Sequence, residues 1–268
     1  MSDDTRLGAL APIVARKLEE ASQLRCAAAA LWAGAERMTP ARGFVDALHG
    51  GRIVAEMKRR SPSGGELRDG LDPAAVARGY ASAGAAALSV LTDGPDFGGS
   101  LDDLVDARDA VAIPVLRKDF TVDAVQVAEA RVAGADAVLL IAALLDTAAL
   151  DACLDAAARL GVDAVVEVHD EDEARRAVDA GARCVGVNNR DLRSLRTDLD
   201  TFSRVRALIP EGVVCVAESG VRSEEDVRRL VGEGADAVLV GELLMRSDDP
   251  AAACASLVRA ARAAAVPR

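Results

Sequence analysis

Apolar and polar positions alternate in blocks along the chain from residue 53 onward. Short apolar runs of strand type recur, and segments with helical periodicity separate them. The predicted strands are residues 53–58, 87–93, 114–120, 137–143, 164–169, 184–190, 214–220 and 237–242. Apolar strands that alternate with helices are typical of parallel sheets covered by helices. The pattern therefore predicts an α/β protein built from repeated βα units.

Two of the predicted helices have clear ends. The segment "SEEDVRRLVGEGA" begins at Ser223, with Asp226 in capping-box spacing, and ends at Gly234. The segment "DEDEARRAVDAGA" runs from Asp170 to Gly181. A weak internal repeat places a glycine at positions 84, 134, 181 and 234, each time between a helix end and a buried strand. This order is typical of right-handed βαβ crossovers.

Eight βα units in roughly 215 residues favour a closed (βα)8 barrel, the TIM barrel. An open doubly wound sheet is the alternative, but it usually has a GxGxxG turn after its first strand, and no such motif occurs here. We predict that residues 48–268 form the barrel. Residues 1–47 read as a helical extension packed on the barrel, in which we expect Trp32 and Lys17 to be structural and Lys17 to lie on an exposed helix face.

The amino-acid composition indicates the cellular compartment in which we expect the protein. Apolar residues make up 51% of the chain and charged residues 28%, and no apolar run approaches the roughly 18 residues that a membrane span needs. The N-terminal "MSDDTRLGAL" lacks the features of a signal peptide, and five scattered cysteines suit small buried residues in a reducing compartment. We expect a soluble cytoplasmic protein without a membrane partner or a metal site, either a monomer or a weak oligomer.

The net charge of the chain limits the classes of ligand that it can bind. A net charge of −11 argues against nucleic-acid binding, which needs a basic surface, but does not exclude a small anionic ligand. Only three of the 32 basic residues are lysines, at positions 17, 58 and 118. A lysine amine can exchange a proton, whereas arginine stays protonated. Lys58 and Lys118 are therefore candidates for proton chemistry.

Polar side chains follow the apolar runs at the predicted strand ends. Glu56 and Lys58 share one face of the first strand, because side chains alternate with period two. The others are Lys118, Glu167, His169, Asn188, Arg190, Glu218 and Ser219. In a (βα)8 barrel these ends meet at the catalytic end, and burying an unpaired charge costs several kcal/mol. The charges are therefore expected either to form a closed salt-bridge network or to bind a ligand.

Two further groups of residues follow the strands. Ser219, Gly220 and Gly241 come after the last two strands, where barrel loops often bind phosphate through backbone N–H groups. Apolar residues near the other strand ends are Pro62, Phe97, Phe120, Leu139 and Ile141. These residues suit either a pocket for a flat ring or ordinary core packing.

With these residues identified, the chain resembles the indole-3-glycerol phosphate synthase family. The matching blocks, in family order, are "AEMKRRSPSGG", "SVLTDGPDFGGS", "PVLRKDF", "VEVHDEDE", "VNNRDL", "ESGV" and "GELLM". The resemblance implies a barrel with an N-terminal helical extension that helps to cover the active site. It also implies conversion of 1-(2-carboxyphenylamino)-1-deoxyribulose 5-phosphate to indole-3-glycerol phosphate, with release of CO₂ and water and without a metal or organic cofactor.

The resemblance further implies roles for individual residues. Lys118 matches the general acid for ring closure, Glu167 matches the acid/base group of the dehydration, and Glu56 matches a residue that positions Lys58. The expected catalytic residues are Lys118, Glu167, Glu56, Lys58 and Asn188. The expected substrate-binding residues are Ser61, Pro62, Phe97, Phe120, Leu139, Ile141, Arg190, Glu218 and Ser219, and the expected phosphate-binding residues are Gly220, Gly241 and Lys58. Glu242 departs from the serine that we expect there, so we expect phosphate contact through backbone only, with the Glu242 side chain turned away.

Three other functions remain open at this point. The first is a phosphoribosylanthranilate isomerase-like enzyme, which would be a similar barrel. Such an enzyme would have a cysteine on the first strand, which this chain lacks. A Schiff-base aldolase would also place a lysine at a strand end. A non-catalytic barrel that binds a phosphorylated ligand is the alternative outside enzymes.

Overall fold

Strands and helices alternate along the chain as predicted, and the strands form one closed barrel. The computed structural model describes residues 10–62, 64–191, 194 and 196–265. Its barrel strands are β1 (Arg52–Met57), β4 (Ala87–Leu91), β5 (Val115–Lys118), β6 (Ala137–Ile141), β7 (Asp163–Val168), β8 (Cys184–Asn188), β9 (Val214–Glu218) and β10 (Ala237–Val240). All neighbouring pairs are parallel, and β10 pairs with β1 to close the barrel. The predicted (βα)8 barrel is confirmed, with each strand ending one or two residues earlier than expected.

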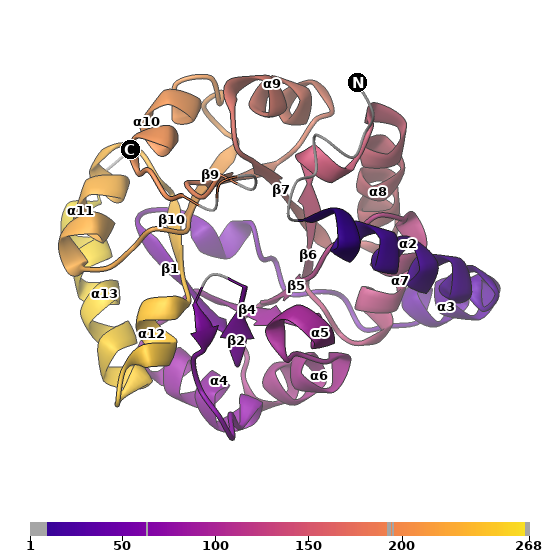
Figure 1. The fold of residues 1–268 in the computed structure, drawn as a ribbon, viewed down its shortest axis with the longest axis horizontal. Helices are drawn as coiled ribbons and strands as arrows, with labels where there is room; N and C mark the ends of the chain where they lie inside the picture. Colours follow the sequence, from indigo (N-terminus) through magenta and orange to yellow (C-terminus); the bar gives the residue numbers. More distant parts are fainter. Residues whose placement is uncertain (1–9, 63, 192–193, 195, 266–268) are drawn as a thin grey trace.

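The helices surround the barrel (Figure 1). Those of the described residues are α2 (Ala11–Arg25), α3 (Ala28–Glu36), α4 (Pro73–Ser82), α5 (Gly94–Phe97), α6 (Leu101–Ala110), α7 (Ala124–Val132), α8 (Thr147–Leu160), α9 (Glu171–Asp179), α10 (Asp200–Arg206), α11 (Glu224–Gly232), α12 (Glu242–Arg246) and α13 (Pro250–Ala264). The short 3-10 helices are η2 (Asp46–Leu48) and η3 (Ala142–Leu144). Asp170 caps α9 and Ser223 caps α11, as their sequences predict.

The core has two layers, because successive strand residues face opposite sides. On β1, Val54 packs inside the barrel with Leu116 and Leu139. Its neighbours Ile53 and Ala55 pack outward against the helices. Val54 therefore faces the barrel interior, on the same side of β1 as Glu56.

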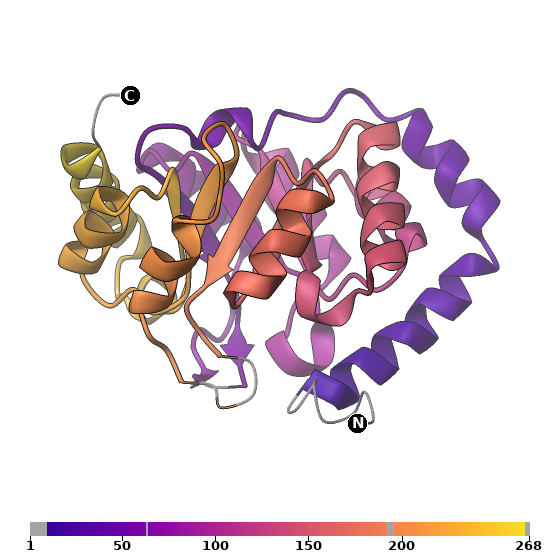
Figure 2. The ribbon, with the colours of Figure 1, turned by 90° about the horizontal axis from the view of Figure 1, so that it is seen from above.

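The N-terminal extension lies along the outside of the barrel. The predicted helical extension contains two helices, α2 and α3, separated at Cys26 and Ala27. Figure 2 shows α2 beginning at one end of the barrel and α3 continuing towards the other. Trp32 of α3 packs under the guanidinium of Arg159, 4.7 Å from the ring centroid. The chain then returns to β1 through Phe44, Val45 and Leu48, which pack against the barrel interior.

Some expectations about the surface need correction or remain open. Four cysteines are buried as expected, but Cys26 is exposed. An unexpected two-stranded antiparallel hairpin, β2 (Arg60–Ser61) and β3 (Gly65–Glu66), follows β1. Within the described part of the chain, no helix has both the length and the apolar character to cross a membrane. The expectation about the N-terminal signal falls on residues 1–9, which lie outside the described residues.

Candidate active site

A cavity of about 780 Å³ opens at the carboxyl ends of the barrel strands. Every predicted catalytic, substrate-binding or phosphate-binding residue lines it. These residues are Glu56, Lys58, Ser61, Pro62, Phe97, Lys118, Phe120, Leu139, Ile141, Glu167, Asn188, Arg190, Glu218, Ser219, Gly220 and Gly241. Closure of the barrel brings them together, although they are far apart in the sequence.

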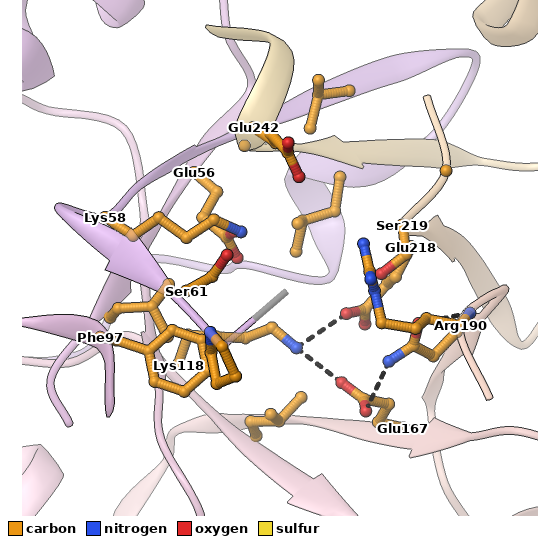
Figure 3. Close-up of a pocket in the computed structure, with 18 of the residues that line it drawn as sticks. Glu56, Lys58, Ser61, Phe97, Lys118, Glu167, Arg190, Glu218, Ser219 and Glu242 are labelled. Atoms are coloured by element: carbon orange, nitrogen blue, oxygen red, sulfur yellow. Dashed lines mark hydrogen bonds and ion pairs between the residues drawn. The ribbon is translucent and has the colours of Figure 1, made fainter. Parts of the chain in front are cut away.

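Lys118 lies at the centre of the charged part of the cavity. It ends β5, and its Nζ donates hydrogen bonds to Glu167 Oε2 at 2.6 Å and to Glu218 Oε2 at 2.8 Å. Figure 3 shows the amine pointing towards both carboxylates. Asn188 donates to the other oxygen of Glu167 at 2.9 Å. One ammonium is thus shared by two buried carboxylates from different strands.

This sharing moves the pKa values of the three groups. Burial would lower the pKa of Lys118, but attraction by Glu167 and Glu218 outweighs it and raises that pKa above its usual value. Burial would raise the pKa of Glu167, but Lys118 and His169 outweigh it and lower it. Burial and repulsion by Glu167 raise the pKa of Glu218 to about 7 despite Lys118. The site therefore holds Lys118 protonated and Glu167 ionised at neutral pH, with Glu218 near its titration point.

His169 supports Glu167 from behind. Its Nε2 lies 3.2 Å from Glu167 Oε1, and its Nδ1 lies 3.0 Å from Glu173 Oε2. Burial would lower the pKa of His169, but the two carboxylates outweigh it and raise it to about 10. The imidazolium adds a second positive charge beside Glu167. His169 stood among the predicted strand-end residues, but it does not line the cavity.

Glu56 and Lys58 form a second ion pair on the opposite side of the cavity (Figure 3). Lys58 Nζ donates to Glu56 Oε1 at 2.5 Å. The other Glu56 oxygen accepts a hydrogen bond from the Ser89 hydroxyl at 3.3 Å. A side chain at Gly241 would overlap the Glu56 carboxylate, so glycine is needed there for Glu56 to occupy this position.

The apolar side of the cavity contains two aromatic rings. Phe97 and Phe120 lie with ring centroids 6.1 Å apart, and Leu139 and Ile141 continue the same side. Sequence reasoning missed three residues of this region, Leu10, Pro12 and Ile13, which come from the extension. No strand-end rule could have found them, because they belong to no βα unit.

The turn after β9 has an unusual backbone. Ser219 has φ 65°, and it is the non-glycine residue with positive φ among those the structure describes. Gly220 follows with φ 88°. Asn189 donates to the carbonyl oxygens of Glu218 and Ser219 at 3.1 and 3.2 Å and holds this turn. Non-glycine residues adopt this conformation at a cost that functional sites often bear.

Glu242 lies at the rim of the cavity, and it does not turn away from it as expected. Arg246, one helical turn later, donates to Glu242 Oε1 at 2.9 Å, so the carboxylate is paired. Arg246 also donates to the Gly64 carbonyl oxygen at 2.7 Å. The arginine thus joins α12 to the β2–β3 hairpin.

The expected exposure of Lys17 is wrong. Lys17 is only 3% exposed, and its amine contacts carboxylates of Glu20, Asp93 and Asp119. Helical periodicity placed it on a polar face, but that face of α2 packs against the barrel. Asp119, which lines the cavity directly after Lys118, was also missed.

The residues described give no metal-binding cluster of histidine, cysteine or carboxylate side chains. The buried carboxylates of the cavity are instead paired with Lys118 and Lys58. The arrangement is suited to proton transfer between a protonated amine and carboxylates in a partly apolar pocket.

Comparison with known proteins agrees with this geometry. The model of the indole-3-glycerol phosphate synthase family matches residues 10–257. The chain is 53% identical over 234 residues to the indole-3-glycerol phosphate synthase of Parafrankia sp. (strain EAN1pec), with 87% of each chain covered. It is 54% identical over 208 residues to that of Mycobacterium ulcerans (strain Agy99), covering 78% of this chain and 76% of that one.

Solved structures share the fold at low identity. Thiamine phosphate pyrophosphorylase from Pyrococcus furiosus superposes with a TM-score of 0.61 at 16% identity, covering 81% of this chain and 98% of that one. This likeness concerns the barrel alone. The family match and the two close relatives together show that the chain belongs to the indole-3-glycerol phosphate synthase family.

Proposed function

We propose that the cavity converts 1-(2-carboxyphenylamino)-1-deoxyribulose 5-phosphate to indole-3-glycerol phosphate, with Lys118 as general acid and Glu167 as acid/base group. The observation that supports these roles best is the Lys118 ammonium held between Glu167 and Glu218 at 2.6 and 2.8 Å. A group that protonates a carbonyl must carry its proton at neutral pH, and the raised pKa of Lys118 meets this need.

The layout of the cavity suits the parts of this substrate. The aromatic ring would lie against Phe97, Phe120 and Leu139, where apolar contact is available. The phosphate would lie at the Ser219–Gly220 turn and Gly241, with Lys58 as the nearby cation. The reacting carbon atoms then fall between these regions, beside Lys118.

The proposed reaction proceeds in two stages. Lys118 donates a proton to the ribulose carbonyl oxygen while the ring carbon that bears the carboxylate attacks the carbonyl carbon. Loss of CO₂ then restores the ring. Glu167, which is ionised, accepts the proton whose loss completes the indole and returns it to the departing hydroxyl, which leaves as water. Electrostatic stabilisation by a preorganised ammonium is a large contribution in such sites.

The experiment that tests this function is an indole-fluorescence assay of the purified protein with the carboxyphenylamino-deoxyribulose phosphate. We expect a rise in indole fluorescence with equimolar CO₂ release. Absence of product from folded protein would favour a binding protein instead. Borohydride trapping provides a second check, because covalent labelling of Lys118 would indicate a Schiff base and contradict the acid role.

We also propose that residues 1–47 form an extension rather than an independent domain. Leu10, directly before α2, and Ile13 and Val14 of α2 pack with the apolar residues of the barrel interior, which supports a single folding unit.

A further inference from the structure

A buried cluster of charges joins the extension to the barrel outside the substrate cavity. Lys17 of α2 is at its centre, with Nζ 2.8 Å from Asp119 Oδ1, 3.1 Å from Asp93 Oδ1 and 3.0 Å from Glu20 Oε2. Asp93 and Asp119 are buried at the ends of two barrel strands. A lysine buried at this depth needs several close acceptors, and this one has three.

Asp119 connects this cluster to the proposed general acid. It directly follows Lys118, and its Oδ1 also accepts the Phe120 backbone N–H at 2.8 Å. Its Oδ2 accepts from the Thr92 hydroxyl at 2.6 Å and from Arg117 at 3.1 Å. Burial would raise the pKa of Asp119, but Arg117 and Lys17 outweigh it and lower it to about 2. The carboxylate is therefore ionised and held on all sides.

Asp93 connects the same lysine to the other aromatic ring. Asp93 is the N-cap of α5, where its Oδ2 accepts the Asp96 backbone N–H at 3.0 Å. Helix α5 ends at Phe97, whose ring packs against Phe120. Arg16 of α2 also donates to Asp93 Oδ1, at 2.8 Å.

We propose that Lys17 is a positioning residue for the reaction, which holds Asp93 and Asp119 together and so fixes Phe97, Phe120 and Lys118 in the cavity. The inference rests on the proposed function, because it concerns the same aromatic side and the same general acid. It assigns the extension a second task besides covering the cavity. Lys17 touches no substrate, since it does not line the cavity.

Loss of the amine would leave two buried carboxylates facing each other with less positive charge between them. Repulsion would separate the loops after β4 and β5, and the two rings with them. Displacing a catalytic group by about 1 Å costs on the order of 10²-fold in rate. Arginine would not replace the lysine, because a planar guanidinium cannot place one nitrogen within 3.1 Å of all three carboxylates as the compact ammonium does.

The test compares Lys17→Met with Arg25→Met in steady-state assays of the full chain. Arg25 is a matched control, since it also joins α2 to the barrel by an ion pair, to Asp123 at 2.7 Å, but it is exposed and this pair involves neither Asp93 nor Asp119. For Lys17→Met we expect kcat to fall about tenfold or more and KM to rise several-fold. For Arg25→Met and the wild type we expect values within about twofold of each other.

Two further measurements separate positioning from stability. Trp32 fluorescence and thermal unfolding establish that the extension remains docked at the assay temperature. If Lys17→Met does not fold, the double variant Lys17→Met/Asp93→Asn takes its place. It removes one of the two carboxylates together with the amine, and asparagine remains a good N-cap for α5. We expect this double variant to regain stability, because the repulsion is removed, but to retain a low kcat, because no ammonium then links the loops after β4 and β5.

A folded Lys17→Met protein, or a folded double variant, with kcat and KM within twofold of the wild type would overturn the inference. A lowered melting temperature with unchanged kcat would do the same, because it would show a purely structural lysine. Lys17→Arg should also lower kcat, and a fully active Lys17→Arg would contradict the geometric part. An inactive wild type would instead refute the proposed function, so the two failures are distinguishable.

Discussion

Three ionisable side chains in contact dominate the chemistry available at the centre of the cavity. Lys118, Glu167 and Glu218 hold two negative charges against one positive charge when all are ionised. Glu218 has the least support, because its Oε1 has no hydrogen-bond partner among the described residues. Glu167 also accepts a hydrogen bond from Asn188 and has His169 Nε2 at 3.2 Å. A carboxyl with an unpartnered buried oxygen is the member of the group that gains most by holding a proton.

Replacing Lys118 tests its role as an acid. We expect Lys118→Ala to lower kcat by about 10²-fold or more, the scale of lost general acid catalysis. The control is Lys118→Arg, which keeps the positive charge between the carboxylates but cannot release a proton at neutral pH. Steady-state kinetics should show a similar loss of kcat in both variants. An arginine variant with nearly full activity would mean that the charge matters and the proton does not.

The raised pKa of Glu218 predicts a pH dependence. As pH rises through about 7, Glu218 loses its proton and adds negative charge to a pocket that must accept an anionic substrate. We therefore expect kcat/KM to fall as pH rises through this range. Glu218→Gln serves as the control, because glutamine does not titrate. Any pH dependence that remains in this variant comes from another group, such as the substrate phosphate. An unchanged inflection near pH 7 in Glu218→Gln would assign the titration to another group.

At the scale of elements, glycines within a strand or directly after one make room for charged side chains from neighbouring strands. A Cβ at Gly186 on β8 would overlap Glu218 Oε1 and press on Val165. Gly241 makes room for Glu56 in the same way. The parallel strands bring their carboxyl ends close together, so a single methyl group on one strand changes the position of a carboxylate on the next.

Gly186→Ala should therefore separate Glu218 from Lys118. We expect kcat to fall about tenfold, because the shared ammonium is displaced, and the free energy of unfolding to fall by about 1–3 kcal/mol from overpacking. The control is Gly232→Ala in α11, where a Cβ would meet nothing within 4 Å and where alanine favours the helix. Urea unfolding and kinetics of both variants check this. Full activity in Gly186→Ala would show that Glu218 can occupy a second position without cost.

At the scale of the whole molecule, residues at both ends of the extension pack into the apolar interior of the barrel. Leu10 and Ile13 pack at the end where the cavity opens, and Phe44 and Leu48 pack from the return segment before β1. Figure 2 shows the two helices between these contacts lying along the side of the barrel. An extension fastened at both ends cannot leave the barrel without exposing core side chains.

We expect the extension to unfold together with the barrel. Trp32, the single tryptophan, lies in α3 and reports the extension, whereas far-UV circular dichroism reports the barrel helices. Urea transitions followed by the two signals should coincide, as in two-state unfolding. An earlier fluorescence transition would show that the extension separates first and would argue for an independent unit.

The barrel and most of the cavity lining were predictable because each depends on local sequence order. Short apolar runs define the strands, and the rule that strand ends meet at one face places Glu56, Lys118 and Glu167 together. The hairpin β2–β3 was missed although Pro62, Gly64 and Gly65 mark a turn, because strands of two residues are too short to show an apolar pattern. The break at Cys26 was missed because no glycine or proline marks it. Lys17 was misplaced because helical periodicity shows that two faces differ but not which polar face becomes buried.

The sequence by itself determined the eight βα units, the family resemblance and the set of residues at the strand ends, because these follow from periodicity and order along the chain. Only the tertiary structure decided how charge is distributed among them. It paired Lys118 with two carboxylates, left one oxygen of Glu218 without a partner among the described residues, and placed Lys17 against Asp93 and Asp119. Electrostatic energies depend on distance and burial in three dimensions, and neither is contained in the spacing of residues along the chain.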